Sequence, residues 1–184
     1  MRVLSLIGVL LASGAGSVSA QHAHQLEIGS FGSYTRYDKD LRLADQFGAG
    51  GRVGYFLGDH FSIEVDADVA QPVSRFSGVG TTAVFWSTSL VINSGGGKSS
   101  LYALGGYSRL HMGPEPLSAS DLNAVHGGLG ERIFVGDRVA LRLEARAYYR
   151  GAGSGQASWL GHFTGTAGLS FILGRAGEQK SQVP

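Results

Sequence analysis

Charged and apolar side chains alternate in two segments of the sequence. In the first, single apolar residues separate Glu64, Asp66 and Asp68. In the second, single apolar residues separate Arg142, Glu144 and Arg146. A period of two places the charges of each segment on one face of a β-strand. The first face is acidic and the second carries a net positive charge, so the two faces are suited to pair as ions.

We expect the charged face of each strand to point into the interior of the fold. Further charged residues lie at positions that place them on this inward face of their own segments. The predicted interior set has nine members: Glu27, Arg52, Glu64, Asp66, Asp68, Arg132, Arg142, Glu144 and Arg146. An unpaired buried charge costs several kcal/mol, so pairing within this set is close to obligatory. We predict a structural ion-pair network. A path for protons or ions along the same residues is the alternative.

A second group of side chains has the types needed for nucleophilic catalysis. Three histidines expected near strand ends and two serines within range form this group: His111, His126, His162, Ser108 and Ser158. A serine activated by histidine and oriented by a carboxylate hydrolyses or transfers acyl chains. However, two glycines follow His126, and no carboxylate stands out as a third member, so we predict no catalytic residues and no enzyme. An acyl hydrolase or transferase that modifies lipid A is the alternative.

The same three histidines are weak candidates for a metal site. The strands carrying His111 and His162 are not expected to be neighbours, and no aspartate or glutamate completes the set. The chain also contains no cysteine, which excludes disulfides and thiolate ligands. We therefore predict no metal and no cofactor.

The elements that must position these residues are predicted strands. Alternation and turn residues indicate eight of them, over residues 25–37, 47–57, 60–70, 81–93, 100–112, 122–135, 138–150 and 162–173. Short links at 58–59, 94–98 and 136–137 alternate with longer ones at 38–46, 71–80, 113–121 and 151–161. The 30 glycines and only four prolines agree with many strands and turns.

An even number of strands, joined alternately by short turns and long loops, is typical of outer-membrane barrels. The strand length of about 11 residues suits a tilted strand that crosses a membrane. We predict an all-β fold, an eight-stranded antiparallel up-and-down transmembrane β-barrel. A soluble barrel is the alternative, because alternation does not say which face meets water. Aromatic residues near strand ends are predicted to form interfacial girdles: Phe47, Tyr55, Phe61, Trp86, Tyr107, Phe134, Tyr148, Tyr149, Trp159, Phe163 and Phe171.

The start of the sequence has the pattern of a secretory signal. Arg2 precedes a short apolar run, and small residues lead to a predicted cleavage site after Ala20. We expect a signal peptide at 1–20, one barrel domain at 21–174 and a short polar tail at 175–184. A retained N-terminal anchor helix is the alternative. The 15 basic and 14 acidic residues nearly cancel, so no nucleic-acid partner is expected.

The last predicted strand carries a recognisable motif. Thr166, Gly168, Phe171 and Leu173 follow the spacing polar-x-Gly-x-x-aromatic-x-hydrophobic, which resembles the terminal-strand assembly signal of outer-membrane proteins. The strand-turn-strand blocks at 50–59 and 129–137 are similar to the OmpA-like transmembrane domain family. The polar tail departs from many members, which end near the aromatic residue. We expect no peptidoglycan-binding domain and therefore no wall-anchoring role.

The resemblance implies a place and a role. The place is the outer membrane, with both termini in the periplasm, and the expected partners are outer-membrane lipid, lipopolysaccharide and the assembly machinery. The expected role is non-enzymatic, in envelope integrity or surface interaction, and the expected state is a monomer. An adhesin that binds through its long loops is a further alternative, with six candidate contact residues: Arg75, Phe76, Glu115, Leu117, Trp159 and Leu160.

Overall fold

The structure is a computed structural model that describes residues 23–39, 42–94, 97–113, 120–150 and 160–174. The predicted signal peptide with its cleavage site at Ala20 and the predicted tail at 175–184 lie outside the described residues. So do Ser158, Glu115, Leu117 and Trp159.

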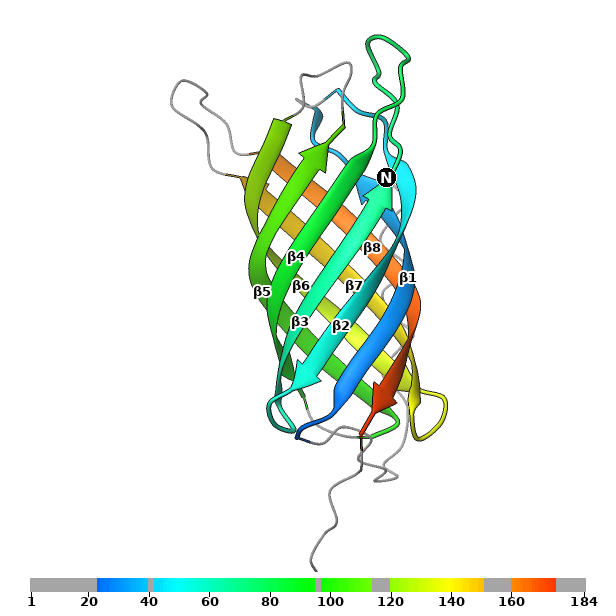
Figure 1. Cartoon of the computed structure of the whole chain (residues 1–184), viewed down its shortest axis with the longest axis vertical. Helices are drawn as coiled ribbons and strands as arrows, with labels where there is room; N and C mark the ends of the chain where they lie inside the picture. Colours follow the sequence, from blue (N-terminus) through cyan, green and yellow to red (C-terminus); the bar gives the residue numbers. More distant parts are fainter. Residues whose placement is uncertain (1–22, 40–41, 95–96, 114–119, 151–159, 175–184) are drawn as a thin grey trace, which may run out of the picture.

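Eight antiparallel strands close into a single barrel, in which each strand pairs with its sequence neighbours and β1 pairs with β8 (Figure 1). The strands are β1 (Leu26–Arg36), β2 (Gln46–Phe56), β3 (Phe61–Ala70), β4 (Ala83–Asn93), β5 (Ser99–Met112), β6 (Ser120–Phe134), β7 (Val139–Arg150) and β8 (Leu160–Leu173). The predicted fold class is confirmed, and each strand boundary lies close to its predicted position.

The two ends of the barrel differ. Short turns join β2 to β3 and β6 to β7 at one end, where Leu26 of β1 also lies opposite Leu173 of β8. At the other end longer loops emerge, and residues 71–82 rise above the rim (Figure 1). This long-loop end is ordered in part by backbone pairing of Leu43 with Ser74 and of Val73 with Gly80. Both described ends of the chain therefore meet at the short-turn end.

Apolar side chains cover the outside of the barrel. Val53, Ile63, Leu90, Leu129 and Leu169, from five different strands, are each 44–69 % exposed. An exposed apolar surface of this extent marks contact with lipid or protein. The soluble-barrel alternative is wrong, because in a soluble barrel these residues would fill the interior.

Most of the predicted girdle aromatics lie on the outer face, but two do not. Tyr148 is 5 % exposed inside the barrel, and Phe134 shares the inward parity of Arg132. The prediction for Tyr148 is wrong because the adjacent Tyr149 faces outward, and only one of two adjacent strand residues can face lipid. None of the described residues forms a helix that is long and apolar enough to cross a membrane.

Candidate functional site: the charged interior of the barrel

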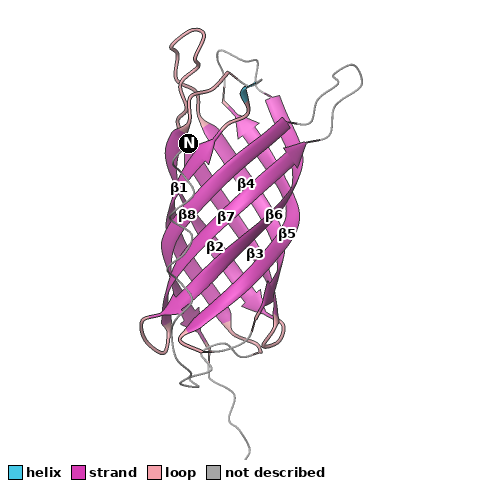
Figure 2. Cartoon of the chain, turned by 180° about the vertical axis from the view of Figure 1, so that it is seen from behind, coloured by secondary structure: helices cyan, strands magenta, loops and turns pink. Residues whose placement is uncertain are grey.

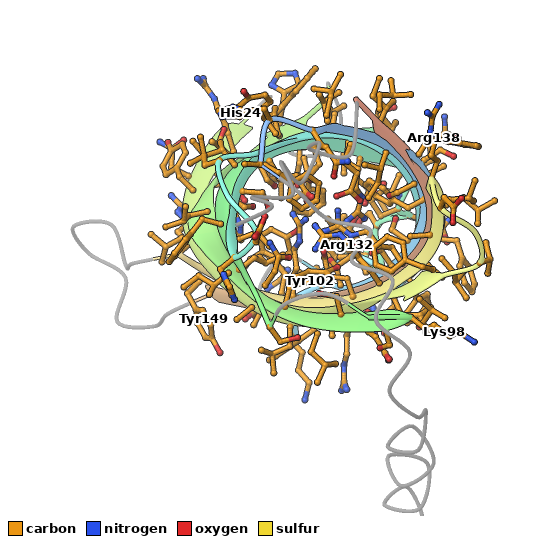
Figure 3. All side chains as sticks on the ribbon, turned by 90° about the horizontal axis from the view of Figure 1, so that it is seen from below. His24, Lys98, Tyr102, Arg132, Arg138 and Tyr149 are labelled. Atoms are coloured by element: carbon orange, nitrogen blue, oxygen red, sulfur yellow. The ribbon has the colours of Figure 1, made fainter. Side chains whose placement is uncertain are left out.

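All nine residues of the predicted interior set lie inside the barrel, on β1, β2, β3, β6 and β7. Each is at most 6 % exposed. The view along the barrel in Figure 3 shows side chains filling the interior, with Arg132 and Tyr102 pointing inward and Lys98, Arg138 and Tyr149 pointing outward. This agrees with the size of an eight-stranded barrel, whose interior is just wide enough for side chains.

Glu144 on β7 is the centre of the network. Its Oε2 atom lies 3.1 Å from Arg52 Nη1 and 3.0 Å from Arg142 Nη2. Its Oε1 atom accepts a bond from Arg146 Nε. Arg142 and Arg146 stand two residues away on the same strand, whereas Arg52 comes from β2, so this carboxylate joins distant parts of the barrel wall.

The acidic face of β3 meets the arginines of β7 across the interior. Glu64 Oε2 lies 2.5 Å from Arg142 Nη1, and Glu64 Oε1 lies 3.1 Å from Arg146 Nη2. Asp66 Oδ1 lies 2.6 Å from Arg146 Nη1. These strands are four positions apart in the ring of eight, so their side chains pair across the lumen.

Glu27 on β1 separates two arginines that would otherwise repel. Arg132 and Arg142 are direct partners on neighbouring strands. Glu27 accepts a bond from Arg132 Nε at 3.1 Å and one from Arg142 Nη1 at 3.0 Å. Arg132 also donates to the side-chain oxygen of Asn93, so a neutral residue completes this part of the network.

Eight of the nine predicted residues form this connected network, in which four arginines balance four carboxylates. Asp68 is the exception. It is buried at 5 % exposure, but within the described part of the chain it forms no ion pair, and its Oδ1 atom has no hydrogen-bond partner. It lies one inward position nearer the long loops than Asp66, and its predicted ion pair is not found among the described residues.

Tyr102 on β5 is a network residue that the sequence reasoning missed. Its hydroxyl donates to Glu144 Oε2 at 2.7 Å and accepts from Arg142 Nε at 3.0 Å. The guanidinium groups of Arg132 and Arg142 lie 4.5 and 4.6 Å from its ring centre, which is within the range of cation–π attraction. Its partner across the strand pair is Gly130, where a Cβ atom would lie 2.2 Å from the Tyr102 hydroxyl. The inward parity of Tyr102 is visible in sequence, but its partners are not.

Replacing Tyr102 by phenylalanine is expected to lower the free energy of unfolding by about 1 kcal/mol. The loss is modest because Arg142 and Glu144 keep their other charged partners and the ring still packs against both guanidinium groups. Urea unfolding in lipid vesicles measures it. Tyr107→Phe, on the outer face of the same strand, is the matched control and should have almost no effect. Equal losses in both variants would contradict the role of the Tyr102 hydroxyl.

Phe31 on β1 packs against Arg52 with 4.4 Å between the guanidinium carbon and the ring centre. Its direct partners on the two neighbouring strands are both glycine, Gly50 and Gly168. A Cβ atom at Gly50 would lie 2.5 Å from the Phe31 ring, and one at Gly168 would lie 2.6 Å from Phe31 Cβ. The two glycines therefore make the space that Phe31 occupies.

The four residues of the terminal-strand motif divide between the two faces of β8. Thr166 and Gly168 face inward, and Thr166 Oγ1 accepts a bond from Arg52 Nη2 at 3.3 Å. Phe171 and Leu173 face outward and are 51 % and 44 % exposed. Two positions of the motif thus contact the interior packing, and two lie on the apolar exterior.

His126 lies deeper in the interior than predicted, in a layer of serines. Its Nδ1 atom lies 2.7 Å from Ser108 Oγ and its Nε2 atom 2.9 Å from Ser89 Oγ, while Ser108 also donates to Ser87 at 2.9 Å. In a hydrolytic triad the second ring nitrogen of the histidine bonds a carboxylate. Here a second serine takes that place, so the contact between Ser108 and His126 is not a triad.

The other two histidines lie elsewhere. His162 faces inward at the long-loop end, where its Nδ1 atom accepts a bond from the Asp38 backbone N–H at 3.1 Å, and His111 faces outward. Among the described residues no group of three histidine, aspartate or glutamate side chains is placed to hold a metal ion.

An apolar layer lies above the charged network, toward the long loops. Its members are buried side chains from the strands and the first loop: Tyr37, Leu43, Ala83, Phe85, Leu110, Met112, Leu122 and Tyr148. Phe85 and Tyr148 are in ring contact at 5.5 Å between centres. The interior therefore changes from charged to apolar along the barrel axis.

Comparison with known proteins identifies the fold. No family model and no curated protein matches the sequence. Among solved structures, the chain is similar to the N-terminal barrel domain of Pseudomonas aeruginosa OprF, with 17 % identity, a TM-score of 0.62, and coverage of 83 % of this chain and 100 % of that one. It is also similar to OprG of Pseudomonas aeruginosa, with 11 % identity, a TM-score of 0.63, and coverage of 85 % of this chain and 100 % of that one. The similarity to Ail of Yersinia pestis has 11 % identity, a TM-score of 0.58, and coverage of 82 % of this chain and 99 % of that one. The chain has the fold of the eight-stranded outer-membrane barrels.

Proposed function

From this fold and its side-chain-filled interior with a charge-balanced network, we propose that the chain is a small outer-membrane protein whose barrel is sealed, with a structural role in the envelope. The single observation that carries the proposal is the ion-pair network, whose eight members are each at most 6 % exposed and span the interior. A water-filled pore requires a lumen that side chains do not fill. The apolar layer toward the long loops supports closure, since ions do not cross such a layer readily.

The remaining parts of the proposal follow from the outward surface and the topology. Lipid surrounds the apolar exterior, and lipopolysaccharide surrounds its long-loop end. The short-turn end, with both termini, faces the periplasm, as is usual for these barrels. The terminal strand engages the assembly machinery, and the barrel acts as a monomer without a cofactor. The serines on both nitrogens of His126 favour a non-enzymatic role over lipid A modification.

Planar-bilayer recording tests the sealed barrel. We expect no large steady conductance, because no continuous column of water passes the charged network. Folding is checked separately by gel mobility, since a closed barrel has no free edge and its unboiled form migrates faster than the boiled one. A porin-sized open state as the dominant level, in protein that passes this check, would contradict the proposal.

A second candidate function, surface binding, is favoured by one feature of the loops. Phe76 is 83 % exposed at the tip of residues 73–80. Arg42 lies 5.8 Å from its ring centre, and the neighbouring Arg75 is fixed by a bond from its Nε atom to Leu43 O at 2.9 Å. An exposed aromatic ring between arginines has the composition of a binding hot spot and suits an anionic ligand. Ail, which shares only the fold, has been crystallised with the heparin analogue sucrose octasulfate.

Heparin binding by the detergent-folded protein tests this candidate. We expect the Arg42→Ala and Phe76→Ala variants to weaken binding by roughly three- to tenfold each, which corresponds to the loss of one charged or aromatic contact. Lys98→Ala removes an exposed cation at the opposite end and serves as the control. If all three variants bind alike, the loop has no specific role.

A further inference from the structure

One carboxylate, that of Glu131, lies on the outer, apolar face of the barrel. Glu131 on β6 stands between Leu129 and Ile133 along its strand, and its partners on the adjacent strands are Leu101 and Leu143. Charged residues on the lipid face destabilise a barrel in a manner that depends on their depth. Glu131 lies three residues from the short-turn end of β6, where this cost is small, so the carboxylate can stay ionised there and meet a partner from outside the chain.

One oxygen of this carboxylate is held by a neighbouring strand, and the other is open to a partner as far as the described residues show. Ser99 Oγ on β5 donates to Glu131 Oε1 at 2.5 Å. The other oxygen, Oε2, has no partner among the residues that the structure describes. Glu131 is only half-buried, so a donor from outside the barrel can reach Oε2.

An apolar hollow on the outer surface adjoins Glu131. It has a volume of about 950 Å³ and extends over the outer faces of β6, β7, β8 and β1, with Leu101 of β5 and Phe47 of β2 at its borders. Figure 2 shows the side of the barrel formed by β6, β7 and β8 from the front. Leu129 and Leu143 stand beside Glu131 at one end, and Tyr34 lies at the other. The floor consists of side chains with almost no bulk: Ala145, Gly165, Ala167 and Gly32. The volume is in the usual range for small-molecule sites, about 300–1,000 Å³, and its walls suit a hydrocarbon chain.

Two cations lie at the short-turn rim of the barrel, on the side of the hollow where Glu131 lies. Lys98 directly precedes Ser99, and Arg138 lies in the turn between β6 and β7. Both are exposed and point outward from the barrel (Figure 3). The carboxylate, the apolar hollow and the two cations thus lie on the same side of the barrel, with both cations at its short-turn end.

We propose that this surface binds a phospholipid with a primary-amine headgroup, of the phosphatidylethanolamine class. Glu131 Oε2 accepts a hydrogen bond from the headgroup ammonium, Lys98 and Arg138 attract the phosphate, and an acyl chain fills the hollow. This site rests on the proposed membrane orientation, which places it in the periplasmic leaflet. A second copy of the chain fits less well, because a twofold dimer on this face would bring the same carboxylate of each copy into one apolar interface.

Native mass spectrometry of the folded protein in detergent tests the headgroup contact. Phosphatidylethanolamine, phosphatidylglycerol and phosphatidylcholine with identical acyl chains are added at equal concentration. We expect the wild-type protein to retain phosphatidylethanolamine roughly three- to tenfold better than the other two, as one charge-assisted bond allows. Glu131→Gln should abolish the preference. Asp137→Asn, which neutralises an exposed carboxylate in the nearby turn, should keep it.

A second pair of variants tests the hollow. Gly165→Leu fills its floor without a clash, since no atom lies within 4 Å of a Cβ at this position. We expect it to reduce retention of all three lipids. Gly51→Leu adds the same side chain to the outer face of β2, outside the hollow, and should retain lipid like the wild type.

The outcomes separate the site from the proposed function. Each variant is first shown to fold by gel mobility. An unchanged preference in Glu131→Gln, equal retention of the three lipids by the wild type, or a dimer that Gly165→Leu abolishes would overturn the lipid site. None of these results would contradict the sealed barrel. A porin-sized conductance would contradict the sealed barrel but would not contradict the lipid site.

Discussion

Replacing Arg142 by alanine is expected to lower the free energy of unfolding by about 3–5 kcal/mol, the usual loss when one partner of a buried ion pair is removed. Arg142 is 1 % exposed and pairs with Glu27, Glu64 and Glu144. Its removal leaves Glu27 with Arg132 as its one remaining arginine among the described residues and gives the network, which was balanced, a net negative charge. Water enters a narrow, closed lumen poorly, so solvent compensates little of this loss.

Urea unfolding in lipid vesicles measures the effect of Arg142→Ala. Arg150→Ala is the matched control, because Arg150 lies on the same face of β7 but is only half-buried at the long-loop rim, and it forms no ion pair among the described residues. The control should lose less than about 1 kcal/mol. Similar losses in both variants, or a loss under about 1 kcal/mol for Arg142→Ala, would show that the network contributes little to stability.

Replacing Gly168 by alanine is expected to destabilise the barrel by about 3 kcal/mol, at the upper end of the range for overpacking. A Cβ atom at this position would lie 2.1 Å from Ser30 O and 2.6 Å from Phe31 Cβ. The first contact is with backbone of a paired strand, which cannot move without disturbing the junction of β1 and β8. Gly165→Ala, on the other face of β8, meets no atom within 4 Å and should leave stability unchanged.

This pair also separates two explanations for the terminal-strand motif. Refolding of urea-denatured protein into detergent requires no assembly machinery, so a packing defect should appear there as well as in cells. We expect Gly168→Ala to refold poorly in both settings, whereas Phe171→Ala, which loses an outward side chain, should be impaired mainly in cells. If Gly168→Ala refolds like the wild type in detergent and fails only in cells, recognition by the machinery explains the glycine.

Much of the fold could be predicted because a strand leaves its faces visible in sequence. The alternation along residues 61–69 and 138–150 showed which side chains share a face, and the turns between them gave the strand number. The charged face could be assigned to the interior because buried charges can pair there, whereas the hydrocarbon chains of lipids offer no partners. The prediction failed where adjacent residues are both aromatic, as with Tyr148 and Tyr149, because the alternation then does not show which of the two faces inward.

The sequence by itself determined the strands, their two faces and the charged set that faces inward, because these depend on residues that are near neighbours along the chain. Only the tertiary structure decided which charges meet. The closure of the ring brings Arg142 within reach of Glu64 on the far wall and of Glu27 two strands away, and it leaves Asp68 without an ion pair among the described residues. The roles of Tyr102 and Phe31 likewise depend on the glycines opposite them. Pairing across a closed lumen depends on strand register and distance, and neither quantity is local to any one segment.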